Sequence, residues 1–310
     1  MTTDDTPIQT SAGFVAVLGA PNAGKSTFVN RAVGAKVSIV SPKVQTTRTR
    51  VLGIAIQDGA QILFVDTPGI FEPRRRLDRA MVASAWGSAS DADMIMLMID
   101  AERGVDKNST SIIDGLLKRK AERPKSPAPV LVLNKVDAVN KERLLTIAQE
   151  LSTLELFSDI FMISALTGDG VRDLVSFAAA RMTPGPWLYP EDQISDMPIR
   201  LLSAEITREK LYFQLQQELP YAATVETETW SELKDGSIRI EQVIFVERDS
   251  QKAIVLGKKG ARIKEIGAAS RLELERMLEN RVHLFLFVKV RDGWGDDPER
   301  YRDWGLDFDA

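Results

Sequence analysis

The sequence predicts an α/β domain, with a mostly parallel sheet and helices on both faces, followed by an α+β domain. Its 310 residues are many for one domain and typical of two. In the first part, short apolar runs alternate with helical patterns, which is typical of a parallel sheet. After a proline-rich stretch the element order changes. We therefore expect a polar N-terminal tail at 1–12, a first domain at 13–182, a linker at 183–196 and a second domain at 197–310 that ends in an acidic tail.

The composition narrows the possible functions. The chain is 44% hydrophobic and 27% charged, as soluble globular proteins are, and its net charge of −4 indicates that any basic surface is local. The absence of cysteine excludes disulfides and cysteine-ligated zinc, and the single histidine, His283, lies in an apolar run. No apolar run reaches the length of a membrane span and the N-terminus lacks a signal-peptide pattern, so we expect a cytoplasmic protein.

The first strand, at 14–18, leads into a glycine-rich loop. The loop reads G-x-x-x-x-G-K-S from Gly19 to Ser26, and a helical pattern begins at Thr27. This is the context of a phosphate-binding P-loop, whose backbone N–H groups converge on an anion. Lys25 can then reach the outer phosphates and the Ser26 hydroxyl can bind Mg²⁺. A chance glycine-rich turn is the alternative, and the motifs that follow argue against it.

The next strands, at 51–57 and 61–65, lead straight into Asp66-Thr67-Pro68-Gly69. In P-loop nucleotidases a strand that ends in aspartate places its carboxylate beside the metal. Gly69 can offer its backbone N–H to the γ-phosphate. The D-x-x-G pattern alone is a weak signal, because it is also ordinary turn chemistry. Its position one hairpin after a P-loop makes it a strong one.

A motif that selects guanine follows a later strand. The apolar run at 130–133 delivers Asn134-Lys135-Val136-Asp137. A carboxylate at Asp137 can accept both N1–H and N2–H of guanine, and adenine offers neither donor there. A short strand at 160–163 then leads to Ser164 and Ala165, whose backbone can close over the base. We therefore predict a GTP-binding domain.

The remaining elements of this domain fit the same architecture. The run at 94–100 is apolar on both faces, as a central parallel strand should be. Every motif falls at the carboxyl end of a strand, where ligands bind in such folds. Helical patterns separate the strands at 77–90, 109–123, 141–156 and 171–181.

The second domain follows an α-β-β-α-α-β pattern. Lys234 to Ser237 is a hairpin turn signal, and Gly257-Lys258-Lys259-Gly260 enters a helical pattern. A G-x-x-G loop in this order is the signature of a KH RNA-binding domain, here of type II. The expected elements are a helix at 203–217, strands at 223–230 and 238–246, a helix through residue 278 and a last strand at 283–290.

The G-x-x-G loop lies in a local basic patch. From Gln251 to Lys264 there are five basic residues and no acidic one. An ordinary helix-entry turn on a solvated face is the alternative to an RNA-binding loop. For the acidic tail after Asp292, docking on the domain and disorder both remain open. The predicted RNA-binding residues are Gly257, Lys258, Lys259, Gly260, Arg262 and Lys264.

The combined motifs resemble the Era family of GTPases. The resemblance rests on GAPNAGKS, QTTR, DTPG, NKVD and SAL, followed by GKKG, and covers nearly the whole chain. It implies that Ser26, Asp66 and one of Thr46 and Thr47 hold Mg²⁺. It assigns phosphate binding to Gly19, Asn22, Ala23, Gly24, Lys25, Ser26 and Thr27; switch I to Thr46 and Thr47; switch II to Asp66, Thr67, Pro68, Gly69 and Ile70; and guanine binding to Asn134, Lys135, Asp137, Ser164 and Ala165.

The resemblance also implies partners. These are GTP and GDP, the 3′ end of 16S ribosomal RNA, the 30S subunit during assembly, and the inner membrane for a peripheral fraction. Ile70 stands where Ras-like enzymes have a water-positioning glutamine, so we expect slow intrinsic hydrolysis. Asn22 suggests a K⁺ ion in place of an arginine finger, as in related GTPases.

Two other classes of function remain as alternatives to an Era-like GTPase. One is a related GTPase whose second domain binds a protein partner and not RNA. The other is a P-loop kinase for a small molecule, against which NKVD argues, because a kinase needs no guanine-reading aspartate.

Overall fold

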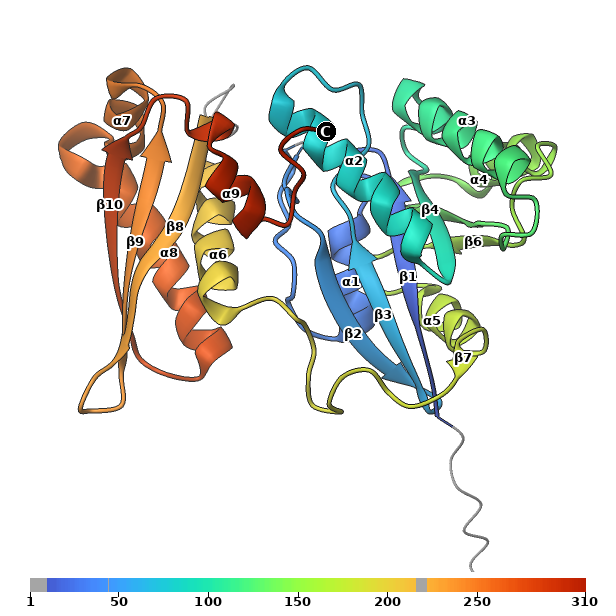
Figure 1. Cartoon of the computed structure of the whole chain (residues 1–310), viewed down its shortest axis with the longest axis horizontal. Coiled ribbons are helices and arrows are strands. Elements are labelled where there is room, and N and C mark those ends of the chain that lie inside the picture. The colour runs from blue at the N-terminus through green and yellow to red at the C-terminus, as the bar shows by residue number, and fades with distance from the viewer. Residues whose placement is uncertain (1–9, 44, 216–221) are drawn as a thin grey trace, which may run out of the picture. The chain divides into compact units, whose positions relative to one another are not determined.

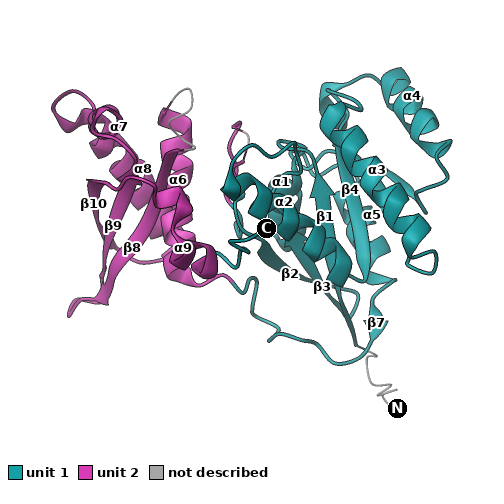
Figure 2. Cartoon of the chain, turned by 45° about the horizontal axis from the view of Figure 1, so that its top comes forward, with its two compact units in different colours: residues 1–38, 47–196, 304–310 teal, residues 39–46, 197–303 magenta. Residues whose placement is uncertain are grey.

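The computed structural model describes residues 10–43, 45–215 and 222–310 (Figure 1). It divides into two compact units, which Figure 2 colours separately. Unit 1 comprises Met1–Ser38, Thr47–Asp196 and Trp304–Ala310, and unit 2 comprises Ile39–Thr46 and Met197–Asp303. The main division, after Asp196, falls at the predicted end of the linker. Two short segments, at 39–46 and 304–310, belong to the unit that the sequence did not indicate.

Unit 1 is built on a sheet in the order β2-β3-β1-β4-β5-β6, with β7 beside β1. Its neighbouring strands are parallel, except that β2 is antiparallel to β3 and β7 is antiparallel to β1. The predicted α/β class with a mostly parallel sheet is confirmed. The strands are β1 (Ser11–Gly19), β2 (Val51–Gln57), β3 (Ala60–Asp66), β4 (Met94–Asp100), β5 (Val130–Asn134), β6 (Ile160–Ile163) and β7 (Thr183–Pro184).

The central strands are apolar because helices cover both faces of the sheet. On one face Leu97 and Leu131 pack with side chains of α2, α3 and α4. On the other face, Phe64 of β3 meets Phe28 of α1 edge to face, with ring centroids 5.4 Å apart. The helices are α1 (Lys25–Val33), α2 (Arg76–Asp91), α3 (Lys107–Glu122), α4 (Lys141–Ser152) and α5 (Val171–Ala179).

The predicted linker packs along unit 1. The side-chain carbonyl of Gln61 accepts the N–H groups of Leu188 and Tyr189 at 2.8 and 3.0 Å. The Ser195 hydroxyl donates to the carbonyl of Leu52 at 2.7 Å. The stretch is therefore fixed to β2 and β3 and is not a free spacer. Its proline content predicted an irregular backbone but could not show these side-chain partners.

Unit 2 is a three-stranded sheet with helices against it. The order is β10-β9-β8, with β10 parallel and β8 antiparallel to β9. This is the predicted α-β-β-α-α-β arrangement of a KH domain, and it is confirmed. The predicted end of its first helix, at 217, lies outside the described residues. The elements are α6 (Ile199–Gln214), β8 (Ala223–Glu232), β9 (Ile238–Val246), α7 (Asp249–Leu256), α8 (Ala261–Leu278) and β10 (Val282–Val290).

The structure decides between the two alternatives left open for the C-terminal tail and shortens the expected N-terminal tail. At the C-terminus, Trp294 and Tyr301 of the expected tail are buried, and α9 (Pro298–Asp303) lies in unit 2. The last seven residues belong to unit 1, where the Arg76 guanidinium lies 4.2 Å from the ring centroid of Phe308. The tail is thus docked. At the N-terminus, β1 begins at Ser11 and so shortens the expected tail, whose residues 1–9 lie outside the described residues.

None of the helices within the described ranges is both long enough and apolar enough to cross a membrane.

Candidate functional site

The P-loop backbone lies so close to the base-side motif that only glycine fits between them. Gly24 links the loop to α1 with a φ of 97°. A Cβ there would lie 2.1 Å from Nδ2 of Asn134. Of the other predicted phosphate-binding residues, Gly19 ends β1, Asn22 has a φ of 65°, Ala23 is buried, and Ser26 and Thr27 are in the first turn of α1.

Lys25 is buried at the start of α1. Its ammonium donates to the carbonyls of Gly19 and Ala20, both at 3.1 Å. Burial lowers the pKa of Lys25 to about 8, and the nearby Asp66 carboxylate opposes that shift. The ammonium therefore lies where the loop would bring phosphate, and an anion there would favour its charged form.

Asp66, at the end of β3, is the centre of a cluster of hydroxyl groups. Its Oδ2 accepts a hydrogen bond from the Ser38 hydroxyl at 2.6 Å. The hydroxyls of Ser26 and Thr47 lie 2.9 Å apart, and that of Thr47 is 3.5 Å from Asp66 Oδ2. Burial raises the pKa of Asp66, and hydrogen bonds from Ser26 and Ser38 oppose that rise.

These residues fit a magnesium ion. The second carboxylate oxygen of Asp66, Oδ1, is buried and has no partner among the described residues. Mg²⁺ prefers carboxylate and hydroxyl oxygens and commonly uses one or two carboxylates together with substrate phosphates. The orphaned oxygen and the two hydroxyls of Ser26 and Thr47 are such a donor set.

The structure distinguishes the two predicted switch I threonines. The Thr47 hydroxyl faces Ser26 and Asp66. The Thr46 hydroxyl bonds instead to the Ser41 hydroxyl at 2.6 Å and donates to the Lys43 carbonyl at 2.8 Å. Only the Thr47 side chain therefore faces the candidate metal site.

The predicted switch II segment lies against the P-loop. The Thr67 hydroxyl donates to the Val17 carbonyl at 2.7 Å, and the Ile70 N–H donates to the Gly19 carbonyl at 3.1 Å. A Cβ on Gly69 would come within 2.9 Å of Pro21. The Ile70 side chain is buried in the core under α2 and α3, so it cannot orient a water molecule.

Asn134 joins the three loops that make up the predicted pocket. Its side-chain nitrogen donates to the Ala23 carbonyl of the P-loop at 2.8 Å. Its side-chain oxygen accepts the Ala165 N–H at 2.9 Å. Ser164 is fully buried and its hydroxyl accepts the N–H of Thr167 at 3.1 Å. Asp137, which is predicted to read the base, is exposed three residues after the end of β5.

Asp100 is a residue of this pocket that the sequence analysis did not assign. It ends β4 opposite Asn134, and its carboxylate accepts a hydrogen bond from the Lys135 ammonium at 2.6 Å. Lys135 has a φ of 68°, so its backbone is held in an unfavourable region. The aspartate that ends the apolar run at 94–100 was the available signal, but pairing of β4 with β5 was needed to interpret it.

In the G-x-x-G loop of unit 2, both glycines have a positive φ, and the first glycine also has no room for a side chain. Gly257 and Gly260 have φ values of 71° and 76°. A Cβ on Gly257 would lie 2.7 Å from Cβ of Arg262. The Arg262 guanidinium donates to the Ile254 carbonyl at 2.6 Å, so this predicted RNA-binding residue braces the loop. Lys258, Lys259 and Lys264 are exposed.

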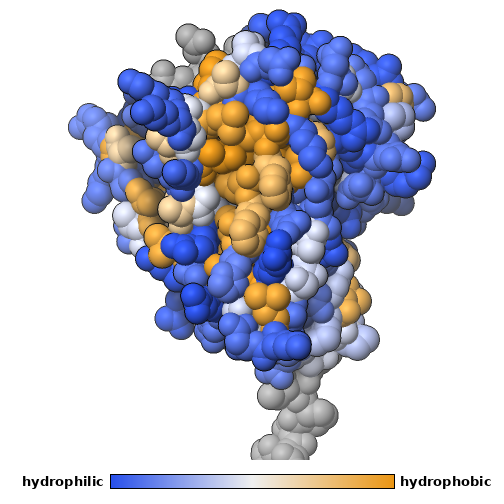
Figure 3. Space-filling view, turned by 90° about the vertical axis from the view of Figure 1, so that its left-hand side faces the viewer, coloured by the Kyte–Doolittle hydropathy of each residue, from blue (hydrophilic) through white to orange (hydrophobic). Residues whose placement is uncertain are grey.

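Exposed apolar side chains accompany the basic loop in unit 2. Both α7 and α8 pack against β10, the edge strand of the sheet. Figure 3 shows a continuous hydrophobic area on the face that it draws. The alternation in VHLFLFVKV could have indicated the outward-facing phenylalanines. The large exposed apolar residues on these elements are Ile254, Leu272, Phe285, Phe287 and Val290.

The fold and the pocket define a P-loop protein that binds guanine nucleotides and has a KH domain after its nucleotide domain. Comparison with known families agrees. A family model described as "50S ribosome-binding GTPase" matches residues 14–135, and one described as "KH domain" matches residues 218–295.

Comparison with curated proteins identifies the family within the GTPases. The chain is 62% identical to GTPase Era of Sinorhizobium medicae (strain WSM419) over 314 residues, which covers 99% of each chain. It is 61% identical to GTPase Era of Brucella suis biovar 1 (strain 1330), over 97% of this chain and 94% of that one. The chain belongs to the Era family of GTPases.

Solved structures of Era superpose on most of the chain. One is Era in complex with MgGDPNP and nucleotides 1506–1542 of 16S ribosomal RNA, with a TM-score of 0.89 and 39% identity over 96% of this chain and 99% of that one. Another is an Aquifex aeolicus Era variant bound to GDP·AlF4−, with the same TM-score, identity and coverage. Family membership removes the small-molecule kinase from consideration.

Proposed function

We propose that the protein hydrolyses GTP with Mg²⁺, binds the 3′ end of 16S ribosomal RNA through its KH domain, and acts in assembly of the 30S subunit. The observation that carries the nucleotide part is Asn134, whose amide joins the P-loop to the base-side loop. The same amide thereby aligns the phosphate and guanine subsites. The Era complex with MgGDPNP and ribosomal RNA supports the RNA part.

In this proposal each group of the nucleotide pocket has a distinct task. Lys25 and the loop N–H groups bind the phosphates, and Asp137 reads the base. Ser26, Thr47 and Asp66 would hold Mg²⁺, which when bound draws charge from the phosphate oxygens. Gly69 offers its backbone N–H to the γ-phosphate next to the P-loop.

The side chain at position 70 cannot position the attacking water, so another group must contribute. We propose Asn22, with a K⁺ ion beside it, because this residue lies in the P-loop at the position where the family resemblance implies a K⁺ ion. GTP turnover should then be faster in K⁺ than in Na⁺ buffer, and Asn22→Ala should remove the difference. Equal rates of the parent in both buffers would refute the K⁺ site.

The RNA part assigns the sugar-phosphate backbone to the G-x-x-G loop. Glycine at 257 and 260 lets the RNA backbone approach, and the exposed Lys258 and Lys259 supply charge. Phe287 offers an exposed ring on which a single-stranded base can stack.

A matched glycine pair tests this assignment. Gly260 and Gly236 both have positive φ, and a Cβ at either meets nothing within 4 Å. Aspartate at either position therefore adds the same charge with the same backbone strain. Gly260→Asp should lose binding of a 3′-terminal 16S ribosomal RNA fragment, whereas Gly236→Asp, in the β8–β9 turn, should keep it. Both variants should bind GTP as the parent does.

Two outcomes would contradict the RNA proposal. A parent that does not bind the fragment would favour the alternative in which the second domain binds a protein. Normal RNA binding by Gly260→Asp would remove the G-x-x-G loop from the interface.

A further inference from the structure

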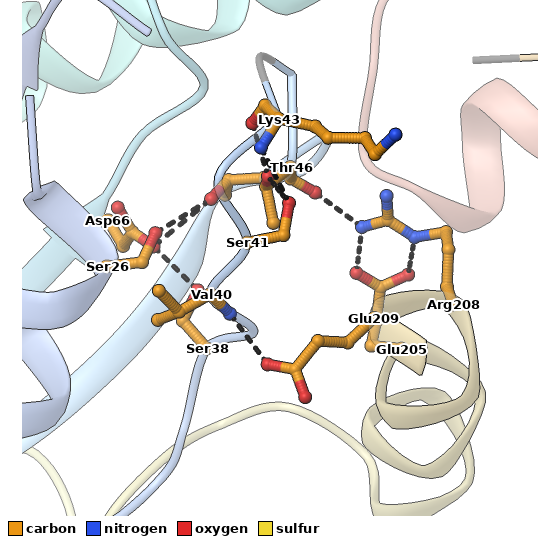
Figure 4. A network of polar contacts seen from close by, with 11 residues as sticks. Ser26, Ser38, Val40, Ser41, Lys43, Thr46, Asp66, Glu205, Arg208 and Glu209 are labelled. Atoms are coloured by element: carbon orange, nitrogen blue, oxygen red, sulfur yellow. Dashed lines mark hydrogen bonds and ion pairs between the residues drawn. The ribbon is translucent and has the colours of Figure 1, made fainter. Parts of the chain in front are cut away.

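The segment Ile39–Thr46 belongs to unit 2, although Ser38 and Thr47 on either side of it belong to unit 1. Two contacts hold it against α6, and Figure 4 shows both; a third joins it to Leu215, the residue after that helix. The Val40 N–H donates to Glu209 Oε1 at 2.9 Å, and Arg208 Nη2 donates to the Thr46 carbonyl at 2.6 Å. The Lys43 ammonium donates to the Leu215 carbonyl.

Both ends of this segment lead to the candidate metal site. Ser38 donates to Asp66 Oδ2 at 2.6 Å, and Thr47 lies 2.9 Å from Ser26. The carbonyl that Arg208 holds is part of the peptide group that joins Thr46 to Thr47. Because that peptide is planar, fixing its carbonyl also restricts where the Thr47 backbone can lie.

The arginine itself is firmly held. Arg208 is only 1% exposed, and its guanidinium is paired with Glu205 through Nε at 2.7 Å and through Nη2. Its remaining nitrogen, Nη1, is buried without a partner among the described residues. A planar guanidinium fixed on one side by a carboxylate presents its other donors in a set direction.

We propose that Arg208 and Glu209 are positioning residues for the switch I threonine of the nucleotide site. By holding Ile39–Thr46 they keep the Thr47 hydroxyl towards Ser26 and Asp66. This inference rests on the proposed GTP function. It makes the first helix of the KH domain part of the device that distinguishes GTP from GDP.

The same contacts continue towards the helix that follows the G-x-x-G loop. The Lys210 ammonium pairs with Glu209 at 2.7 Å and with Glu273 of α8. Glu209 therefore contacts Ile39–Thr46 through Val40 and also contacts the Lys210 ammonium, which pairs with α8 as well. A shift of α8 on RNA binding would change the surroundings of Glu209, and so the hold on Val40.

The expected effect is on nucleotide discrimination. Thr47 can contribute to a complex with Mg²⁺ and the γ-phosphate, and GDP lacks that phosphate. Loss of the contacts that hold Ile39–Thr46 should therefore weaken binding of GTP more than binding of GDP. A hydrogen bond from a charged buried donor is involved, so we expect about a tenfold fall in the ratio of GTP to GDP affinity.

The test compares Arg208→Ala and Lys43→Ala with Arg200→Ala. Arg200 lies on the same helix and also donates to backbone carbonyls, but those belong to Glu228 and Thr227. Affinities for GDP and for a non-hydrolysable GTP analogue are measured with Mg²⁺, together with thermal unfolding and RNA-fragment binding. Lys43 is only partly buried, so its removal leaves the core intact.

Arg208→Ala should lower the affinity ratio about tenfold, and Lys43→Ala about threefold. Arg208→Lys, which keeps the charge without the fork, should fall between Arg208→Ala and the parent. Arg200→Ala should keep the parent ratio. The inference is overturned if the ratio is unchanged in Lys43→Ala and also in a folded Arg208→Ala or Arg208→Lys variant. A parent that binds neither nucleotide would refute the proposed function instead.

Discussion

Single residues of the pocket have two kinds of task. Asn134 is 2% exposed and uses both ends of its amide on other loops, so its task is to position them. Asp137 is exposed at the start of a short helical turn, where its carboxylate can face a ligand. Base selectivity should therefore depend on Asp137 more than on any buried neighbour.

Asp137→Asn replaces one acceptor with a donor, so N1–H and N2–H of guanine are no longer both matched. We expect GTP affinity to fall about a hundredfold or more, because a recognition site with an unmatched polar group discriminates strongly. Xanthosine triphosphate, which presents the complementary group, should restore binding. Isothermal titration of both nucleotides measures this, with Asp114→Asn on exposed α3 surface as the control. A variant that still binds GTP like the parent would exclude Asp137 from base reading.

Lys25 predicts a pH dependence of nucleotide affinity. Burial lowers its pKa to about 8 in the free protein, and bound phosphates must raise it, since opposite charge favours the ammonium. Well below pH 8 Lys25 is protonated in both the free and the bound protein, so the affinity is constant. Above pH 8 the free protein loses the proton that binding must restore, so affinity should fall, by at most about tenfold per pH unit. Titrations from pH 7 to 9 should show this fall, and Lys25→Arg, which keeps its charge, should lack it.

At the scale of elements, continuous apolar runs predicted the buried strands well. The strands at 94–100 and 160–163 have the predicted bounds. For the strand at 94–100 the reason is that a strand buried on both faces needs an unbroken apolar run. Helix ends were less predictable. The helix expected to reach 156 ends at Ser152, and Glu155 then adopts a φ of 48°. The apolar residues beyond Ser152 continue the period of the helix, so the sequence contains no signal that the helix ends there.

Motifs of the site were predictable because each is contiguous in sequence. Their tertiary partners were not, since these depend on which strands pair and which loops meet. The Asp100–Lys135 pair and the Ser38–Asp66 hydrogen bond are examples. The docking of 39–46 against α6 is another, because nothing in SIVSPK indicates a helix elsewhere in the chain as its partner.

The edge strand β10 supports a prediction about base stacking. Phe287 is 48% exposed, and its neighbours Leu286 and Val288 pack against the core of unit 2. The ring of Phe285, by contrast, is 4.8 Å from the Arg239 guanidinium. Phe287→Ala should therefore weaken binding of the RNA fragment about tenfold or more, as expected when one stacked base loses its ring. Phe213→Ala, with 57% exposure on α6, is the matched control and should bind RNA normally. Fluorescence anisotropy gives both affinities, and parent-like binding by Phe287→Ala would show that this ring contacts no base.

At the scale of the whole molecule, two short segments depart from the linear domain boundaries. Ile39–Thr46 belongs with unit 2, and Trp304–Ala310 belongs with unit 1. The second contacts α2, the helix after switch II, where Arg76 also donates to the Phe308 carbonyl at 3.2 Å. The peptide that leads into Thr47 and the helix after switch II are therefore each contacted by residues that the linear domain boundaries assign to the KH domain. A nucleotide that moves either region must then do work against these contacts.

The final prediction is a reciprocal coupling between GTP and RNA. If GTP strengthens the hold of α6 on Ile39–Thr46, RNA bound to unit 2 must change GTP affinity by the same factor that GTP changes RNA affinity. We expect tighter RNA binding with a GTP analogue than with GDP, in line with the Era complex that contains both MgGDPNP and ribosomal RNA.

Measuring all four affinities closes the thermodynamic cycle and gives the coupling factor twice. Arg208→Ala should bring that factor close to one while leaving RNA affinity with GDP unchanged. A coupling factor that survives this substitution would mean that the signal passes elsewhere, with the contacts of Arg76 to the C-terminal segment as the next place to test.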